Sequence, residues 1–162
     1  MVFLMWGGIA AIAGLLVLLV ESVVGLHASD ESYANVILWL IITPVAAVGS
    51  MVHKRMKALD SFGYGAALST GLITSAAATA GLLIVWLLFV GVLFPEYFGL
   101  MHRYATQQAL DQGHSGTLLA QEIHSAKLIF DSPSFYLISA IIPLLVGTVA
   151  SFIGAIGVRK RS

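Results

Sequence analysis

Four long apolar runs constrain this chain more than any other feature of its sequence. They cover residues 2–26, 33–52, 65–94 and 134–158, and the last two contain no charged side chain. A helix needs about 20 apolar residues to cross the roughly 30 Å hydrocarbon core of a bilayer, so each run is long enough. The alternating pattern of membrane β-strands is missing, and helices satisfy their own backbone hydrogen bonds in lipid. The sequence therefore predicts an all-α polytopic membrane protein with four transmembrane helices in one membrane domain.

Composition excludes several other classes of protein. Of the 162 residues, 59% are hydrophobic and 10% are charged, against roughly a quarter charged in an average soluble domain. Eight Lys and Arg balance eight Asp and Glu, so no excess of positive charge points to nucleic acid. The chain has no cysteine, which excludes disulfides and thiolate chemistry. The first run is longer than the apolar core of a signal peptide, so we expect it to be a retained helix.

Basic residues predict the orientation of the helices. Lys54, Arg55 and Lys57 follow the second run, and residues 159–161 after the fourth run contain three more. Basic loops are retained in the cytoplasm. We therefore expect both termini to be cytoplasmic and the segment 95–133 to lie on the external side.

The segment 95–133 is too long for a structureless connection, and its pattern predicts two amphipathic external helices. The first begins after Pro95 and stops near Gln112 and Gly113, and the second begins at Ser115 or Thr117. These helices either rest on the membrane surface or fold back over the bundle, or they form a surface for a partner protein. The candidate partner face contains Tyr97, Met101, Tyr104, Leu119, Ile123 and Phe130.

Small residues in the third and fourth runs predict close helix packing, because lipid offers no hydrophobic drive for helices to associate. The first half of the third run is built of small residues and its second half is bulky. We therefore expect the first half to be buried against neighbouring helices and the second half to be more exposed to lipid. Pro44 and Pro143 predict kinks in the second and fourth runs. The candidate packing or oligomer-interface residues are Gly71, Ala77, Gly147 and Ser151.

Glu21 is the one ionisable residue inside a run, and an intramembrane carboxylate suggests a functional site. Near the outer end of its helix, Glu21 has three open interpretations. It reaches the membrane interface, it bonds to a hydroxyl such as that of Thr43 or Ser139, or it serves a transporter or channel. The other polar groups within the runs are scattered Ser and Thr residues, which is weak support for a transport pathway.

Few other residues suggest chemistry. Three histidines in the external segment, His102, His114 and His124, are weak candidates for a metal site, because their spacing matches no known metal motif. The alternative is that they are solvated surface residues. Catalytic motifs such as GxSxG or a phosphate loop are missing, so we expect no enzymatic activity and no catalytic residues. A bound lipid is plausible, since the basic cluster 54–57 can meet anionic head groups, although its role in topology already accounts for it.

Several weak motifs then suggest a family. The basic stretch HKRMKALDSF leads into the small-residue run, FPEYF ends that run, and DSPSF precedes a last run that contains Pro143 and Gly147. Over residues 52–161 the chain resembles the bacterial four-span membrane proteins of domain of unknown function family 4199. The first two runs match in hydropathy only, and basic residues before the first run are missing. The resemblance implies four helices in a bacterial inner membrane and brings no established reaction.

The sequence as a whole favours a non-enzymatic integral membrane protein. We expect an accessory or structural subunit of a membrane complex, or a homo-oligomer, whose partners are the lipid bilayer and other membrane proteins or further copies of itself. A small transporter or channel using Glu21 is the first alternative. A metal-binding or enzymatic external site is the second.

Overall fold

The computed structural model describes the whole chain except residues 26–36, 59–60, 131 and 160–162, and the side chains at 37, 39, 129, 130 and 132. The described residues form helices and short connections, with no strand among them. In chain order the helices are α1 (Val2–Val24), the π-helix η2 (Ile37–Ile42), α3 (Thr43–Lys57), α4 (Tyr64–Leu88), the π-helix η3 (Phe89–Leu93), α5 (Tyr97–Asp111), α6 (Gly116–Phe130) and α7 (Ser132–Val158).

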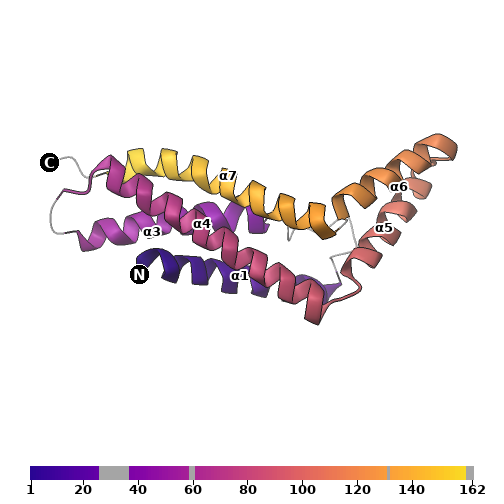
Figure 1. Cartoon of the computed structure of the whole chain (residues 1–162), viewed down its shortest axis with the longest axis horizontal. Helices are drawn as coiled ribbons and strands as arrows, with labels where there is room; N and C mark the ends of the chain where they lie inside the picture. The colour runs from indigo at the N-terminus through magenta and orange to yellow at the C-terminus, as the bar shows by residue number, and fades with distance from the viewer. Residues whose placement is uncertain (26–36, 59–60, 131, 160–162) are drawn as a thin grey trace.

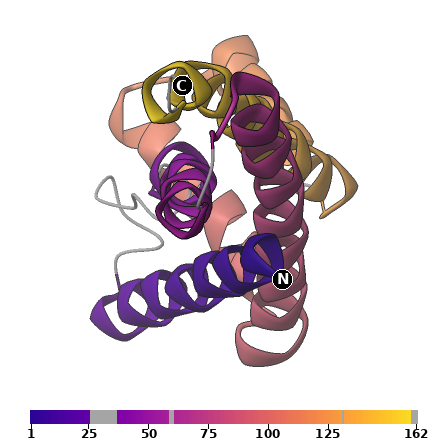
Figure 2. The ribbon, with the colours of Figure 1, turned by 90° about the vertical axis from the view of Figure 1, so that its left-hand side faces the viewer.

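Four helices form an elongated bundle, and two extend beyond it. Figure 1 shows α1, α3, α4 and α7 running side by side, with α5 and α6 projecting from one end. The C-terminus, the end of α3 and the start of α4 lie at the opposite end. In the end view of Figure 2, α3 lies between α1 and α7 while α4 runs along the other side. The most extensive contacts in the bundle are those of α4 with α7 and with α1, and α4 also contacts α3, so we describe it as the central helix.

Within the described residues, three helices are long and apolar enough to cross a membrane. They cover Val2–Val24, Tyr64–Leu93 and Pro133–Val158, which match the first, third and fourth predicted runs. The second predicted run is described from Ile37 onward, as η2 followed by the 15-residue helix α3. Because α3 is short and has Lys54, Arg55 and Lys57 in its last turn, it does not stand as a fourth span by itself. The all-helical prediction is confirmed, and the prediction of four spans is not.

The two prolines lie inside helical paths. Pro44 lies in the first turn of α3, directly after the π-helix η2, so its missing N–H leaves a carbonyl of η2 without its usual donor. The second run changes from π-helix to α-helix at this proline, and the kink expected there stays a prediction. Pro143 lies inside α7 and is among the fully buried side chains. Its ring leaves the Ser139 carbonyl without the usual amide donor four residues later.

Glycines let α4 approach its neighbours closely. A methyl group added at Gly7 of α1 would lie 2.9 Å from Ala77 Cβ, and one at Gly71 would lie 2.7 Å from Ser151 Oγ. At Gly147 the same methyl group would lie 2.6 Å from Ser75 Oγ. The four residues that the sequence singled out for packing, Gly71, Ala77, Gly147 and Ser151, thus all lie where α4 meets α1 or α7.

Buried hydroxyl groups line the contacts of α4 with α3 and with α7. Thr74 Oγ1 of α4 lies 2.8 Å from Ser50 Oγ of α3, and Ser75 Oγ lies 3.4 Å from Ser151 Oγ of α7. Toward the end of the bundle, Lys54 Nζ donates to Thr70 Oγ1 at 3.1 Å. Such hydrogen bonds are worth about 0.6 kcal/mol on average between membrane helices. They therefore add directional contacts between helices whose approach the glycines permit.

An aromatic cluster closes the other end of the bundle. Its centre is Trp86 of α4, whose ring centroid lies 4.9 Å from that of Phe135 and 5.4 Å from that of Tyr97. The lipid exposure expected for the second half of the third run therefore does not extend to one side of that helix. This side packs on α5 and α7, because the bulky aromatic residues meet there. The opposite side, with Ile84, Leu87 and Leu88, is exposed.

Gly147→Ala tests the close approach of α4 and α7. We expect the free energy of unfolding to fall by about 1–3 kcal/mol, the usual cost of overpacking. Gly157→Ala is the matched control on α7, since a methyl group there would meet nothing within 4 Å. The control should raise stability by about 0.5–1 kcal/mol through helix propensity. Unfolding in detergent micelles with added sodium dodecyl sulfate measures both, and equal effects would contradict the packing argument.

Phe135→Ala tests the aromatic cluster. Phe135 is 2% exposed, so we expect a loss of about 3–5 kcal/mol, as for other buried Phe→Ala changes. Phe152→Ala on the same helix is the control, because Phe152 is 47% exposed. Amide hydrogen exchange should also accelerate in α5, which packs on Phe135. Unchanged exchange in α5 would show that the cluster does not hold this helix.

Candidate functional site

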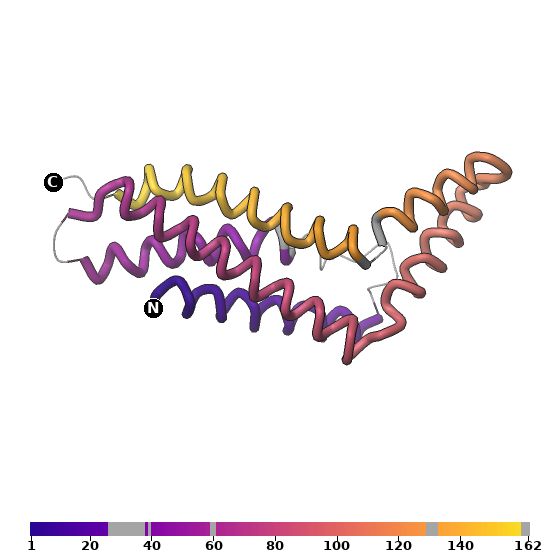
Figure 3. Tube along the Cα trace, in the orientation of Figure 1, coloured from indigo at the N-terminus to yellow at the C-terminus, as the bar shows by residue number. Residues whose placement is uncertain are grey.

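Helices α5 and α6 form an antiparallel hairpin beyond the end of the bundle, as the tube in Figure 3 shows. A glycine in the sequence accounts for the hairpin turn. Gly113 has a φ of +78°, a conformation that glycine adopts without strain. The amides of Gly113 and His114 donate to the carbonyls of Leu110 and Ala109 at 2.9 and 3.0 Å, which is the Schellman pattern of helix ends. This confirms the predicted end of the first external helix near Gln112 and Gly113.

Small and polar residues hold the two hairpin helices together. Ala109 of α5 and Ala126 of α6 are buried between them. Both line a cavity of about 170 Å³, together with Gln108, Glu122 and Ser125. Near the tip, His114 Nδ1 lies 4.0 Å from Glu122 Oε1. The described contact between α5 and α6 thus includes small and polar side chains.

That attachment uses residues that the sequence assigned to a partner face. Tyr97 and Met101 are 2% and 8% exposed, and both belong to the core cluster around Trp86. They are therefore covered by the chain's own helices. Tyr104, Leu119 and Ile123 are half-buried, and the side chain at Phe130 lies outside the described residues.

Among the hairpin side chains that the structure describes, the exposed large apolar ones are leucines outside that predicted face. Leu110 is 47% exposed, Leu118 is 58% exposed and Leu128 is 57% exposed. Leu110 and Leu118 flank the turn, at the tip of the hairpin. Sequence periodicity finds the apolar face of a helix, but it does not show whether a neighbouring helix covers that face. For this reason the sequence named the covered residues and missed these leucines.

Glu21 lies near the C-terminal end of α1 and is only 7% exposed. Thr43 and Ser139, the proposed hydroxyl partners, are also buried. Neither hydroxyl has a hydrogen-bond partner in the described part of the chain. The structure thus buries Glu21 without joining its carboxylate to either of these two hydroxyl groups.

The external histidines are spread over the hairpin. His102 lies on α5, His114 in the turn and His124 on α6. Among the described residues, no three His, Asp or Glu side chains come together in an arrangement that could hold a metal ion. The exposed leucines of the hairpin are the candidate functional surface that remains.

Comparison with known proteins identifies the family. A family model described as "Protein of unknown function (DUF4199)" matches residues 5–160. Comparison with curated proteins and with solved structures gave no match. The family match includes the first two apolar runs, where the resemblance seen in the sequence rested on hydropathy alone. The chain belongs to the DUF4199 family of proteins of unknown function.

Proposed function

We propose that this chain is a non-enzymatic integral protein of a bacterial inner membrane that acts as a subunit of a membrane complex or of a homo-oligomer. The observation that carries the proposal is the hairpin of α5 and α6. It is anchored by the buried side chains of Tyr97 and Met101, and it projects away from the bundle with exposed leucines at its tip.

A membrane topology with four spans fits this arrangement. The helical path from Ile37 through α3 lies beside α4 and α7 and contacts both, as a fourth bundle helix would. Its basic last turn and Arg159 lie at the end of the bundle opposite the hairpin. By the positive-inside rule this end is cytoplasmic, so the proposal places the hairpin on the external side.

The position of the leucines favours a protein partner over the membrane surface. A helix that rests on a bilayer presents its apolar face along its whole length. Here the hairpin extends away from the end of the bundle (Figure 1), so its tip is the part farthest from the spans. Exposed apolar side chains at that distance from the membrane are typical of a contact with another protein.

Replacing both Leu110 and Leu118 with Gln tests this proposal. We expect native mass spectrometry of gently extracted wild-type protein to show a defined assembly, with other polypeptides or with further copies of this chain. The double variant should reduce that assembly at least tenfold while its helix content stays unchanged. Leu128→Gln, an equally exposed leucine at the root of the hairpin, is the control and should assemble normally. A wild-type monomer with no co-migrating partner would refute the proposed role.

Burial of Glu21 favours one second candidate, a small transporter or channel. A carboxylate that is 7% exposed near the end of an apolar helix can bind and release a proton or cation when water reaches it. Four helices enclose little space, so this function would require a homo-oligomer.

Glu21→Gln in liposomes tests the second candidate. The substitution keeps the size of the side chain and removes its charge. If Glu21 carries transport, the proton or cation flux of the wild type should fall to the level of empty liposomes. A wild type without flux, or a variant with unchanged flux, would remove this candidate.

A further inference from the structure

An apolar groove separates α1 from the path formed by η2 and α3. Its volume is about 130 Å³, and it is lined by Trp6, Ile9, Ala10, Ala13, Ile41, Ile42, Val45 and Ala46. Ile9, Ile41 and Val45 are 46%, 51% and 58% exposed, so the groove opens to the side of the bundle. The groove exists because α1 packs more extensively on α4 than on α3.

Trp6 forms one end of this groove, and two nitrogen atoms there lack partners. The Trp6 ring covers Gly49, where an added methyl group would lie 2.6 Å from Trp6 Cη2. Its centroid is 6.5 Å from that of His53, edge to face. Trp6 Nε1 and His53 Nε2 are buried, and neither makes a hydrogen bond within the described residues. Buried polar nitrogens are nearly always hydrogen-bonded in folded proteins, so this end of the groove is suited to an acceptor.

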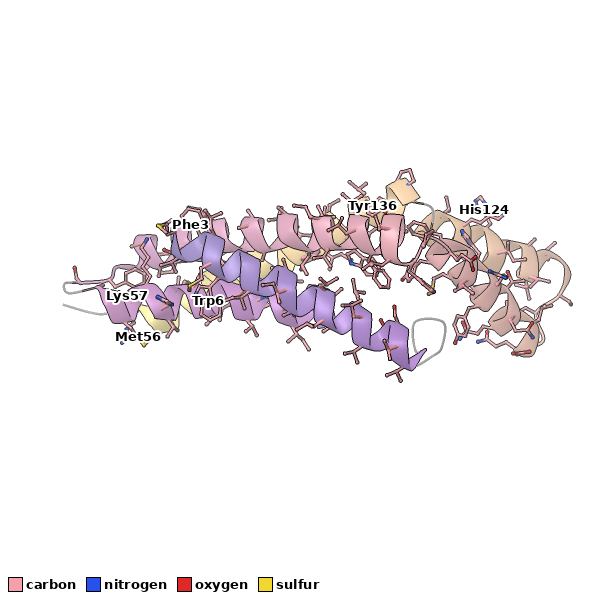
Figure 4. The ribbon with its side chains drawn as sticks, turned by 90° about the horizontal axis from the view of Figure 1, so that it is seen from below. Phe3, Trp6, Met56, Lys57, His124 and Tyr136 are labelled. Carbon is pink, nitrogen blue, oxygen red and sulfur yellow. The ribbon has the colours of Figure 1, made fainter. Side chains whose placement is uncertain are left out.

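A basic residue, Lys57, lies on the same side of α3 as Gly49 and His53. Gly49, His53 and Lys57 are spaced four residues apart, which places them on one helix face. Figure 4 shows Trp6 with Met56 and Lys57 toward the same end of the bundle. Lys57 and Arg55 are exposed, whereas Lys54 bonds to Thr70. The one acid on α1 is Glu21, near the end of that helix opposite Trp6, and α3 contains no Asp or Glu, so no acid on α3 neutralises the charge.

We propose that this groove binds one anionic phospholipid, with an acyl chain between α1 and η2–α3 and the phosphate group at Lys57. The inference rests on the membrane placement in the proposed function. A groove of about 130 Å³ accepts part of one alkyl chain but is too small for a helix, which is about 10 Å wide. A transmembrane partner helix is therefore a poor occupant, while lipid chains surround the groove at this depth.

Chemistry at the end of the groove matches a lipid head group. Phosphate and ester oxygens accept hydrogen bonds, and Trp6 Nε1–H can only donate one. Both unpartnered nitrogens are covered by protein atoms, so a small turn of either ring is needed for it to reach an ester or phosphate oxygen. Lys57 requires no such movement, because its side chain is exposed. Charge thus selects an anionic head group, and the apolar groove holds the chain.

Native mass spectrometry tests the head-group part of the proposal. The full chain is purified in detergent and equilibrated with equal amounts of phosphatidylglycerol and phosphatidylcholine that have the same acyl chains. We expect the wild type to retain one phosphatidylglycerol in preference. Lys57→Gln should lower that preference about fivefold, since a basic residue near an anionic lipid contributes about 1 kcal/mol. Arg159→Gln is the control, because Arg159 is an exposed cation directly after α7, at the same end of the bundle.

A groove-filling substitution tests the acyl-chain part. Val45→Phe adds a ring inside the groove from a side chain that is 58% exposed, so the core of the bundle is left intact. We expect this variant to lose the retained lipid whatever its head group. Val52→Phe, on the same helix but outside the groove and 39% exposed, should retain lipid as the wild type does. Circular dichroism confirms that each variant is folded.

The outcomes separate this inference from the proposed function. A wild type that retains both lipids equally, or retains none, refutes the lipid site and leaves the membrane placement intact. Equal losses in Lys57→Gln and Arg159→Gln also refute it, because they would indicate a diffuse surface charge. Recovery of the protein from the soluble fraction without detergent would refute the membrane placement, and the lipid site with it.

Discussion

Close approach of helices to α4 is the contact on which the rest of this structure depends. Glycine and small residues bring α1 and α7 against α4 at Gly7, Gly71 and Gly147. In lipid, apolar side chains gain little by leaving the solvent, so helices associate through dispersion contacts and hydrogen bonds that need short distances. The Ser and Thr hydroxyls of α4 are effective because the glycines allow that distance. A larger side chain at any of these positions would separate the helices and lengthen the hydroxyl contacts.

The small residues at these contacts of α4, around Gly7, Gly71 and Gly147, form a seam along the bundle. The side chains that fill the bundle differ between this seam and the end next to the hairpin. At the end next to the hairpin, Trp86, Phe89 and Phe135 take the place of the small side chains. The aromatic cluster also receives Tyr97 from α5, which gives the hairpin a buried base. Tyr97 and Met101 thus attach the hairpin to the bundle. A hairpin held in this way can present leucines at its tip in a defined position.

Much of this architecture could be predicted from the sequence, and the limits have physical causes. Apolar runs and turn residues located three long helices, the external helices and the turn at Gly113, because these depend on local composition and backbone conformation. Small residues pointed to the seam around Gly71 and Gly147 for the same reason. The covered faces of α5 could not be predicted, since periodicity does not show which neighbour an apolar face meets. The π-helix before Pro44 leaves no comparable pattern in the sequence. For this reason the sequence predicted a continuous α-helix over the second run, and the structure differs from that prediction.

Helix α1 takes part both in the small-residue contacts with α4 and in the apolar groove beside η2 and α3. One side of α1 is held by α4 through contacts such as Gly7 with Ala77, while the side toward α3 has its main contact where Trp6 covers Gly49. Between these contacts the helix is open to its surroundings along Ile9 and Ala13. Inside a bilayer such a gap does not stay empty, because an unfilled apolar space forfeits dispersion contacts on both walls. An alkyl chain restores those contacts without moving α1 from α4. A lipid in this groove would therefore act as part of the packing of the bundle, and α1 is the helix whose position should respond to the lipid composition of the membrane.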